Sequence, residues 1–103
     1  MTDFERIINE FTKNPREIHT VPLNGQRNKW FYVSVEDGVL FVDKATNKMP
    51  SCNLKKRCLP SRECEKLLEI YHRRANGERV SKEATNTTRS QVYWYGVFSA
   101  LEL

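Results

Sequence analysis

KWFYVSVEDGVLFVD, residues 29–43, gives the strongest local signal of structure in the chain. Two runs of β-branched and aromatic residues, which favour strands, lie on either side of Asp37 and Gly38. An Asp-Gly pair suits a two-residue type I′ turn, in which both central residues have positive φ angles. The segment therefore predicts a β-hairpin.

Both faces of this hairpin are apolar. A two-residue turn pairs Glu36 with Val39, so alternate side chains share a face. The first face, which we expect to form the core, carries Phe31, Val33, Val35, Leu40 and Val42. The second face carries Trp30, Tyr32, Ser34, Val39 and Phe41. Because small domains rarely expose large apolar patches, we expect another element, such as a helix, to cover it; the alternative is a binding surface.

The segments before the hairpin predict a helix and then a connection. Apolar residues at i, i+3, i+4 and i+7 predict an amphipathic helix over 3–12, which ends before Asn14 and Pro15. Residues 16–28 contain Pro22 and Gly25 and are expected to be mostly connection. One short strand could form there around Ile18, Val21 and Leu23.

The segments after the hairpin predict a loop and then helices. Residues 44–59 are polar and basic around Pro50 and read as a loop, with a short strand near Leu54 as an option. A helix is expected from Ser61 to the stop at Asn76 and Gly77, followed by one helical turn over 80–85 capped by Ser81. Residues 90–103 suit either a strand or a helix, and the apolar set at 94, 97, 98 and 101 favours the helix.

These elements predict one α+β domain over residues 1–103, with an N-terminal helix, a β-hairpin or small antiparallel sheet, and two to three C-terminal helices. In a winged-helix-like arrangement, the hairpin would be the wing, and Arg89, Ser90 and Gln91 would begin the recognition helix that contacts DNA. The eight residues from Ala84 to Val92 are about two too few for the standard helix-turn-helix register. Only a diverged version of that motif fits.

Composition is that of a folded, cytoplasmic protein. Hydrophobic residues make up 39% of the chain and charged residues 29%, no apolar run is long enough to span a membrane, and the first residues lack the pattern of a signal peptide. Cys52, Cys58 and Cys64 form an odd set, which favours reduced thiols over disulfides. Their C-x5-C-x5-C spacing with His72 offers a zinc alternative, but zinc sites prefer closer ligand pairs, so we expect Cys64 to pack as an apolar residue.

The chain lacks the common catalytic motifs. The sequence contains no GxGxxG, GxxxxGK[ST], GxSxG or HExxH pattern, and only two histidines are present. The string Glu63-Cys64-Glu65-Lys66 resembles part of a nuclease motif, but acids in the first turn of a helix are already explained by the helix dipole. We therefore expect no catalytic residue, no metal and no cofactor.

Positive charge concentrates in the C-terminal half. The net charge is +4, and ten of the seventeen basic residues fall between positions 55 and 89, although five glutamates are interleaved there. A strip of this kind could contact phosphates, so we expect a non-enzymatic binding domain for nucleic acid, DNA ahead of RNA. The alternative is a module for protein–protein interaction or homodimerisation, and no membrane partner is expected. The candidate nucleic-acid contacts are Lys55, Lys56, Arg57, Arg62, Arg73, Arg74, Arg89 and Gln91.

A second nucleic-acid hypothesis uses the second face of the hairpin. Trp30, Tyr32 and Phe41 could stack on bases beside Lys29 and Lys44. The segment does not match the RRM signature, which requires Gly at its second place.

Four segments of the C-terminal half resemble small uncharacterised proteins of bacterial or phage origin. They are PSRECE at 60–65, YHRR at 71–74, GERVSKEA at 77–84 and TRSQVYWY at 88–95. The resemblance carries no established activity, so it assigns no functional residue.

Overall fold

The computed structural model describes residues 1–22 and 27–103. Leu23, which the sequence placed in a possible short strand, and Gly25, which it placed in the first connection, lie outside these ranges. The elements are α1 (Asp3–Lys13), β1 (Arg16–His19), β2 (Trp30–Glu36), β3 (Val39–Lys44), β4 (Arg57–Cys58), the 3-10 helix η1 (Ser61–Glu63), α2 (Cys64–Ala75), α3 (Ser81–Thr87) and α4 (Gln91–Ala100).

The predicted hairpin is confirmed as β2 and β3, the centre of an antiparallel sheet with strand order β1-β2-β3-β4. Asp37 and Gly38 have φ angles of 52° and 76°, as a type I′ turn requires, and Glu36 pairs with Val39. The predicted core face is also confirmed, except that Val35 is only half-buried. The short strand that the sequence allowed near Leu54 is β4, which forms three residues later, where Arg57 and Cys58 pair with β3.

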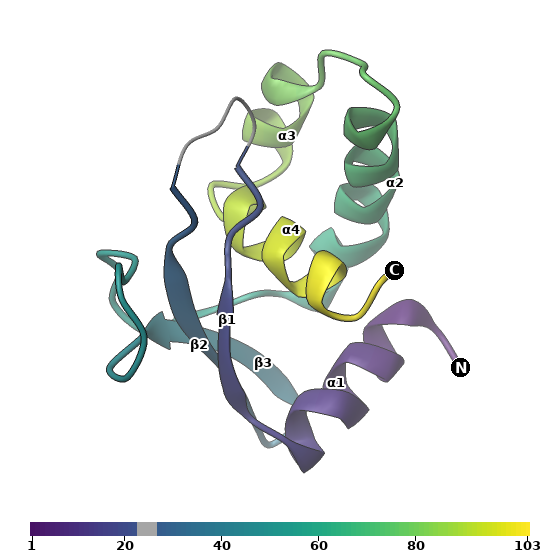
Figure 1. Ribbon diagram of the computed structural model, residues 1–103. Helices are drawn as coiled ribbons and strands as arrows, with labels where there is room; N and C mark the ends of the chain where they lie inside the picture. Colours follow the sequence, from purple (N-terminus) through teal and green to yellow (C-terminus); the bar gives the residue numbers. More distant parts are fainter. Residues whose placement is uncertain (23–26) are drawn as a thin grey trace.

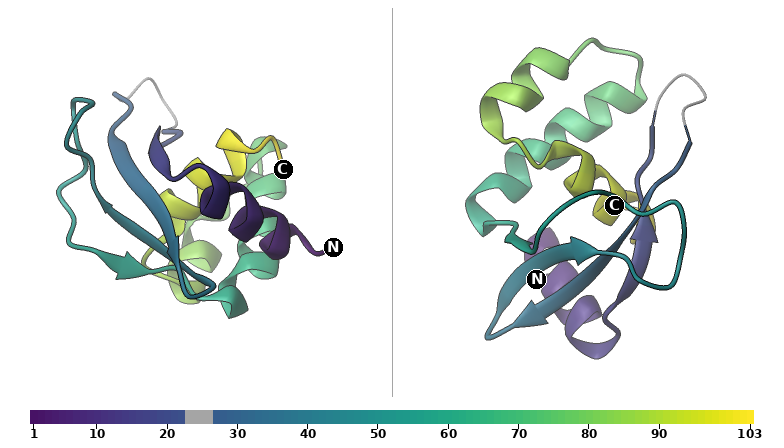
Figure 2. Two further views of the ribbon diagram at one scale, coloured as in Figure 1. Left: turned by 90° about the horizontal axis from the view of Figure 1, so that it is seen from below. Right: turned by 90° about the vertical axis from the view of Figure 1, so that its left-hand side faces the viewer.

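The four helices lie on one side of the sheet, and the loop after β3 lies on the other (Figures 1 and 2). The C-terminal segment that suited either strand or helix is the helix α4, which packs between α2 and β1. Five consecutive residues of α4, 94–98, are buried, so the helix is covered around most of its circumference. The largest fully buried side chains are Trp94, Phe11, Phe31, Phe98, Ile7, Leu40, Leu59, Leu67, Ile70, Val33, Val42 and Val97.

The burial of α4 excludes the winged-helix-like reading of the C-terminal half. A recognition helix must present a face to the DNA groove, but most of the surface of α4 packs against the core. Ser90, at the start of α4, is itself buried. The prediction that Ser81 caps α3 was wrong, because Ser81 is the first residue of that helix and Val80 occupies the N-cap position. Among the described residues, no helix is both long enough and apolar enough to cross a lipid bilayer.

The second face of the hairpin is covered in part, by a loop rather than by a helix. Trp30, Tyr32 and Phe41 are all half-buried. The backbone of Trp30 bonds to Pro50 and Cys52, and Lys48 Nζ lies 4.8 Å from the centre of the Trp30 ring. Sequence correctly indicated that this face needs cover, but the expectation that a helix supplies it was wrong.

Glu17 fastens that loop to the edge of the sheet. Its carboxylate accepts hydrogen bonds from the backbone N–H groups of Thr46, Asn47 and Lys48, at 3.0, 3.1 and 2.8 Å. Burial alone would raise the pKa of Glu17, but the three backbone hydrogen bonds outweigh it, and the pKa lies below its ordinary value. A carboxylate with a lowered pKa stabilises the fold above its unfolded pKa and loses that contribution as the pH falls through the folded value.

Glu17→Gln is therefore expected to unfold at lower urea than the wild type near neutral pH. The difference should shrink as the pH falls below the ordinary titration range of a glutamate and through the lowered pKa of Glu17, because the wild-type carboxylate also becomes neutral there. Urea denaturation across this range measures it. The matched control is Glu65→Gln on α2, an exposed carboxylate with no side-chain hydrogen bond or salt bridge in the described part of the chain, so that only a small helix-dipole contribution is lost. A difference that does not change with pH would contradict the prediction.

Candidate functional site

The basic residues singled out by sequence do not form one strip. Arg73 is surrounded by carboxylates: its guanidinium makes paired hydrogen bonds of 2.7 and 2.8 Å to Glu83 and lies 3.4 Å from Glu78 and 3.7 Å from Glu69. The hydrogen bond from Arg73 lowers the pKa of Glu83, and that from Glu83 raises the pKa of Arg73. Arg73 thus joins α2 to α3 and has its charge neutralised.

Two other predicted contacts are also engaged within the fold. Lys56 pairs with Glu36, and its Nζ lies 4.8 Å from the centre of the Phe41 ring. Arg57 donates to Ser90 Oγ at 3.2 Å and lies over the ring of Tyr93. Lys55, Arg62 and Arg89 are exposed on three different segments.

A large groove gathers a different set of cations. It has a volume of about 1190 Å³. One wall comes from described residues between β1 and β2 and from Cys52 and Asn53. The other wall comes from the end of α2, the segment after it, α3 and the start of α4. Five basic residues line it, namely Arg27, Lys29, Arg74, Arg79 and Lys82. Of the predicted contacts, only Arg74 and Gln91 belong to it.

The groove carries a strong excess of positive charge. Its only carboxylate among the described residues is Glu78, which already lies 3.4 Å from Arg73. In the described part of the chain, none of the five basic residues forms a salt bridge. Arg27, Lys29, Arg79 and Lys82 are exposed, and we call these four the groove rim.

The groove floor is apolar and uncharged. We define it as Cys52, Val80, Ala84, Tyr93 and Tyr95, all buried except the half-buried Tyr93. Burial raises the pKa of Cys52, Tyr93 and Tyr95, so all three are neutral near neutral pH. The electrostatic character of the groove is therefore set by its cations.

Arg74 and Gln91 lie between rim and floor. The Arg74 guanidinium donates to the Val21 carbonyl at 2.8 Å and lies 4.7 Å from the centre of the Tyr95 ring, so two contacts hold its plane in place. Gln91 donates weakly to Thr85 Oγ1 at 3.4 Å. Its Oε1 is buried and has no hydrogen-bond partner among the described residues. A water molecule or a ligand could supply the donor that this atom lacks.

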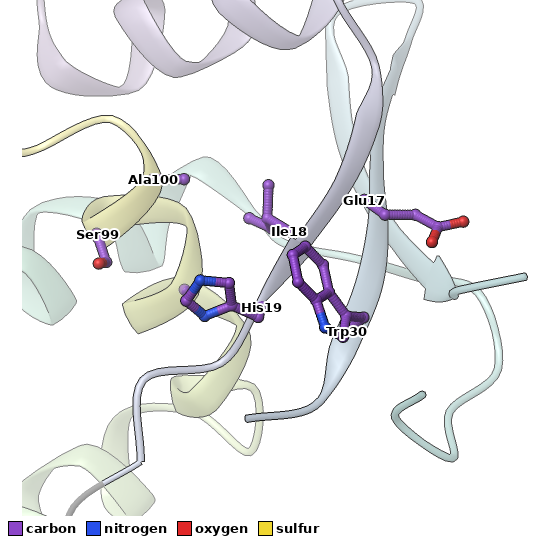
Figure 3. Close-up of a pocket in the computed structure, with 7 residues that line it drawn as sticks. Glu17, Ile18, His19, Trp30, Ser99 and Ala100 are labelled. Atoms are coloured by element: carbon purple, nitrogen blue, oxygen red, sulfur yellow. The ribbon is translucent and has the colours of Figure 1, made fainter. Parts of the chain in front are cut away.

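A second, smaller pocket lies where β1 and Trp30 face the C-terminal half of α4. It has a volume of about 190 Å³, below the usual range for ligand sites, and Glu17, His19, Trp30 and Ser99 contribute to its wall. Figure 3 shows the His19 ring between Trp30 and α4, and the Glu17 carboxylate pointing away from the pocket. His19 Nδ1 lies 2.9 Å from the Thr20 carbonyl oxygen, and the ring meets Trp30 edge-on. The Glu17 carboxylate and His19 Nδ1 therefore already have partners within the protein.

The three cysteines do not share a site. Cys52 and Cys64 are buried and Cys58 is exposed on β4, and all three are free thiols. Cys64 packs on α2, where burial raises its pKa to about 11. Within the described residues, no group of three or more His, Cys, Asp or Glu side chains is placed to hold a metal ion.

Sequence reasoning missed most of the groove. Arg27 and Lys29 precede the hairpin, whereas Arg79 and Lys82 follow α2, and nothing local says that these segments face each other. The available signal was the absence of neighbouring acids around Arg27 and Lys29, where no Asp or Glu occurs between positions 18 and 35. Lys29 was singled out only as a neighbour of the Trp30 face.

The resemblance of the C-terminal half to small bacterial or phage proteins stays a prediction. Comparison with protein-family models, with curated proteins and with solved structures finds no match to this chain.

Proposed function

We propose that this protein is a non-enzymatic nucleic-acid-binding domain whose phosphate contacts lie in the groove. The observation that supports the proposal is the charge of the groove, which combines five basic residues free of salt bridges within the described ranges with one carboxylate that is already paired. A concave surface of one sign concentrates the opposite charge, and a phosphate backbone offers that charge at regular intervals.

The chemistry of the remaining groups supports binding rather than catalysis. The Cys52 thiol and the Tyr93 and Tyr95 phenols have raised pKa values, and each therefore holds its proton near neutral pH. Protonated thiols and phenols are poor nucleophiles. We further propose a cytoplasmic location, which the three free cysteines support.

Titration of a labelled mixed-sequence DNA tests the proposal, with a single strand and a duplex at low and moderate salt. If all five cations neutralise phosphates, the slope of log K against log salt should approach about −3.5 on the single strand and about −4.5 on the duplex. Arg79→Glu with Lys82→Glu should lower the magnitude of that slope by about 2 and weaken binding at least tenfold, roughly. An acid at position 82 also suits the first turn of α3, so folding should be maintained.

The matched control is Lys55→Glu with Arg62→Glu, which changes the net charge equally at exposed positions outside the groove. These two residues belong to the strip that sequence suggested, so the comparison separates the strip from the groove. Equal weakening by both pairs would mean that net charge, not the groove, drives binding. Absence of binding even at low salt would refute the proposal, because phosphate contacts are strongest there.

The groove offers contacts to phosphates and does not itself distinguish DNA from RNA, so the preference for DNA rests on the sequence alone. The protein–protein alternative has less support. Large hydrophobic side chains exposed in the described ranges are Met1, Val39, Met49 and Val92, which belong to four separate segments. Light scattering distinguishes the monomer expected here from a homodimer.

A further inference from the structure

We propose that the groove accepts unpaired nucleotides of a single strand, with phosphates on the groove rim and a base against Arg74 and the groove floor. This inference rests on the proposed function and specifies the form of nucleic acid. It follows from the layering of the groove, which has exposed cations outside and buried apolar residues inside.

The apolar floor distinguishes a single strand from a duplex. A surface that recognised phosphates alone would need only the groove rim. In a duplex the faces of the bases are stacked on one another, so a paired base cannot bring its apolar face to the floor. An unpaired base can leave the stack and bury its face, while its own phosphates stay at the edge of the groove.

Arg74 is placed to contact such a base directly. Its guanidinium is planar, half-exposed and fixed by the Val21 carbonyl and by the Tyr95 ring. Guanidinium planes stack on nucleic-acid bases, and a fixed plane loses little conformational freedom when a base settles on it. Arg74 would therefore act through both its plane and its charge, unlike the four residues of the rim.

Gln91 adds a hydrogen-bond acceptor to the same groove. Its buried Oε1 has no partner in the described part of the chain, and the side chain lines the same groove as Arg74. Rotation of this side chain toward the groove would give the oxygen a partner in the exocyclic amino group of adenine, cytosine or guanine. A phosphodiester group cannot fill that role, because it carries only acceptors at neutral pH.

The decisive experiment compares ligands that have equal phosphates and different bases. The wild-type protein is titrated at low salt with an eight-nucleotide DNA strand, the same strand made abasic, the corresponding duplex, and adenosine monophosphate. We expect the intact strand to bind at least about tenfold tighter than each of the other three. Arg74→Lys keeps the charge and removes the plane, so it should weaken the intact strand by about fivefold or more and leave the abasic strand within about twofold.

The control variant is Arg62→Lys, an exposed exchange of the same kind outside the groove, which should change neither affinity. Equal affinity for intact and abasic strands, or for strand and duplex, would overturn the inference while leaving the proposed function in place. Affinity for the mononucleotide equal to that for the strand would also overturn it, in favour of a free-nucleotide site. If none of the nucleic acids binds, the proposed function itself fails.

Discussion

Gly96→Val is expected to leave most of the protein unfolded, and Gly96→Ala to lower the free energy of unfolding by about 1–3 kcal/mol. A Cβ atom at position 96 would lie 2.8 Å from Phe31 Cζ and 2.9 Å from the carbonyl oxygen of His19. Neither neighbour can move aside, because Phe31 is fully buried in β2 and His19 O belongs to the backbone of β1. Alanine favours a helix over glycine by about 1 kcal/mol, so destabilisation would show that packing outweighs helix propensity.

Chemical denaturation of Gly96→Ala and circular dichroism of Gly96→Val measure these effects. The control is Ser99→Ala, three residues along α4, where the side chain is half-buried and the change removes a hydroxyl instead of adding an atom. That variant should stay within about 0.5 kcal/mol of the wild type. A stabilised Gly96→Ala protein would mean that α4 does not approach the sheet as closely as the structure has it.

The fold was predictable where the signal is local. The turn at Asp37 and Gly38 fixes the register of the hairpin by itself, because only a few residue types accept two successive positive φ angles. Residues 90–103 were ambiguous because a helix buried on nearly all sides loses its polar face, and with it the periodicity that separates helix from strand. The close approach at Gly96 has no local signal at all, since it depends on Phe31 and His19, which belong to two strands far earlier in the chain.

The candidate site was less predictable than the fold, for a related reason. Arg73 and Arg74 are neighbours of identical chemistry, yet one is neutralised by three carboxylates and the other faces the groove. The difference arises because successive helical residues point about 100° apart, and only the arrangement of α3 and β1 decides what each one meets. A count of charges along the sequence cannot make that distinction.

Trp94→Ala is expected to cost about 3–5 kcal/mol of unfolding free energy, out of the roughly 5–15 kcal/mol that a domain of this length has. Trp94 is the largest fully buried side chain and stacks on Phe98 with ring centroids 5.6 Å apart. Phe4 of α1 lies 6.5 Å from it, so the ring joins the first helix to the last. Removing the indole leaves a cavity that such a packed neighbourhood cannot refill.

The contribution of Trp94 can be separated into the packing of its ring and the hydrogen bond of its indole N–H. Trp94 Nε1 donates to Glu63 Oε1 at 3.1 Å, and Glu63 is half-buried at the entry to α2. Trp94→Phe keeps most of the apolar ring and loses that hydrogen bond, so it should cost about 1.5–3 kcal/mol, less than Trp94→Ala. A double-mutant cycle with Glu63→Ala, which removes the acceptor, isolates the bond itself in urea denaturation. Additive effects of Trp94→Phe and Glu63→Ala would assign the whole contribution of Trp94 to packing. Equal losses in Trp94→Phe and Trp94→Ala would contradict the central place of the ring in the core.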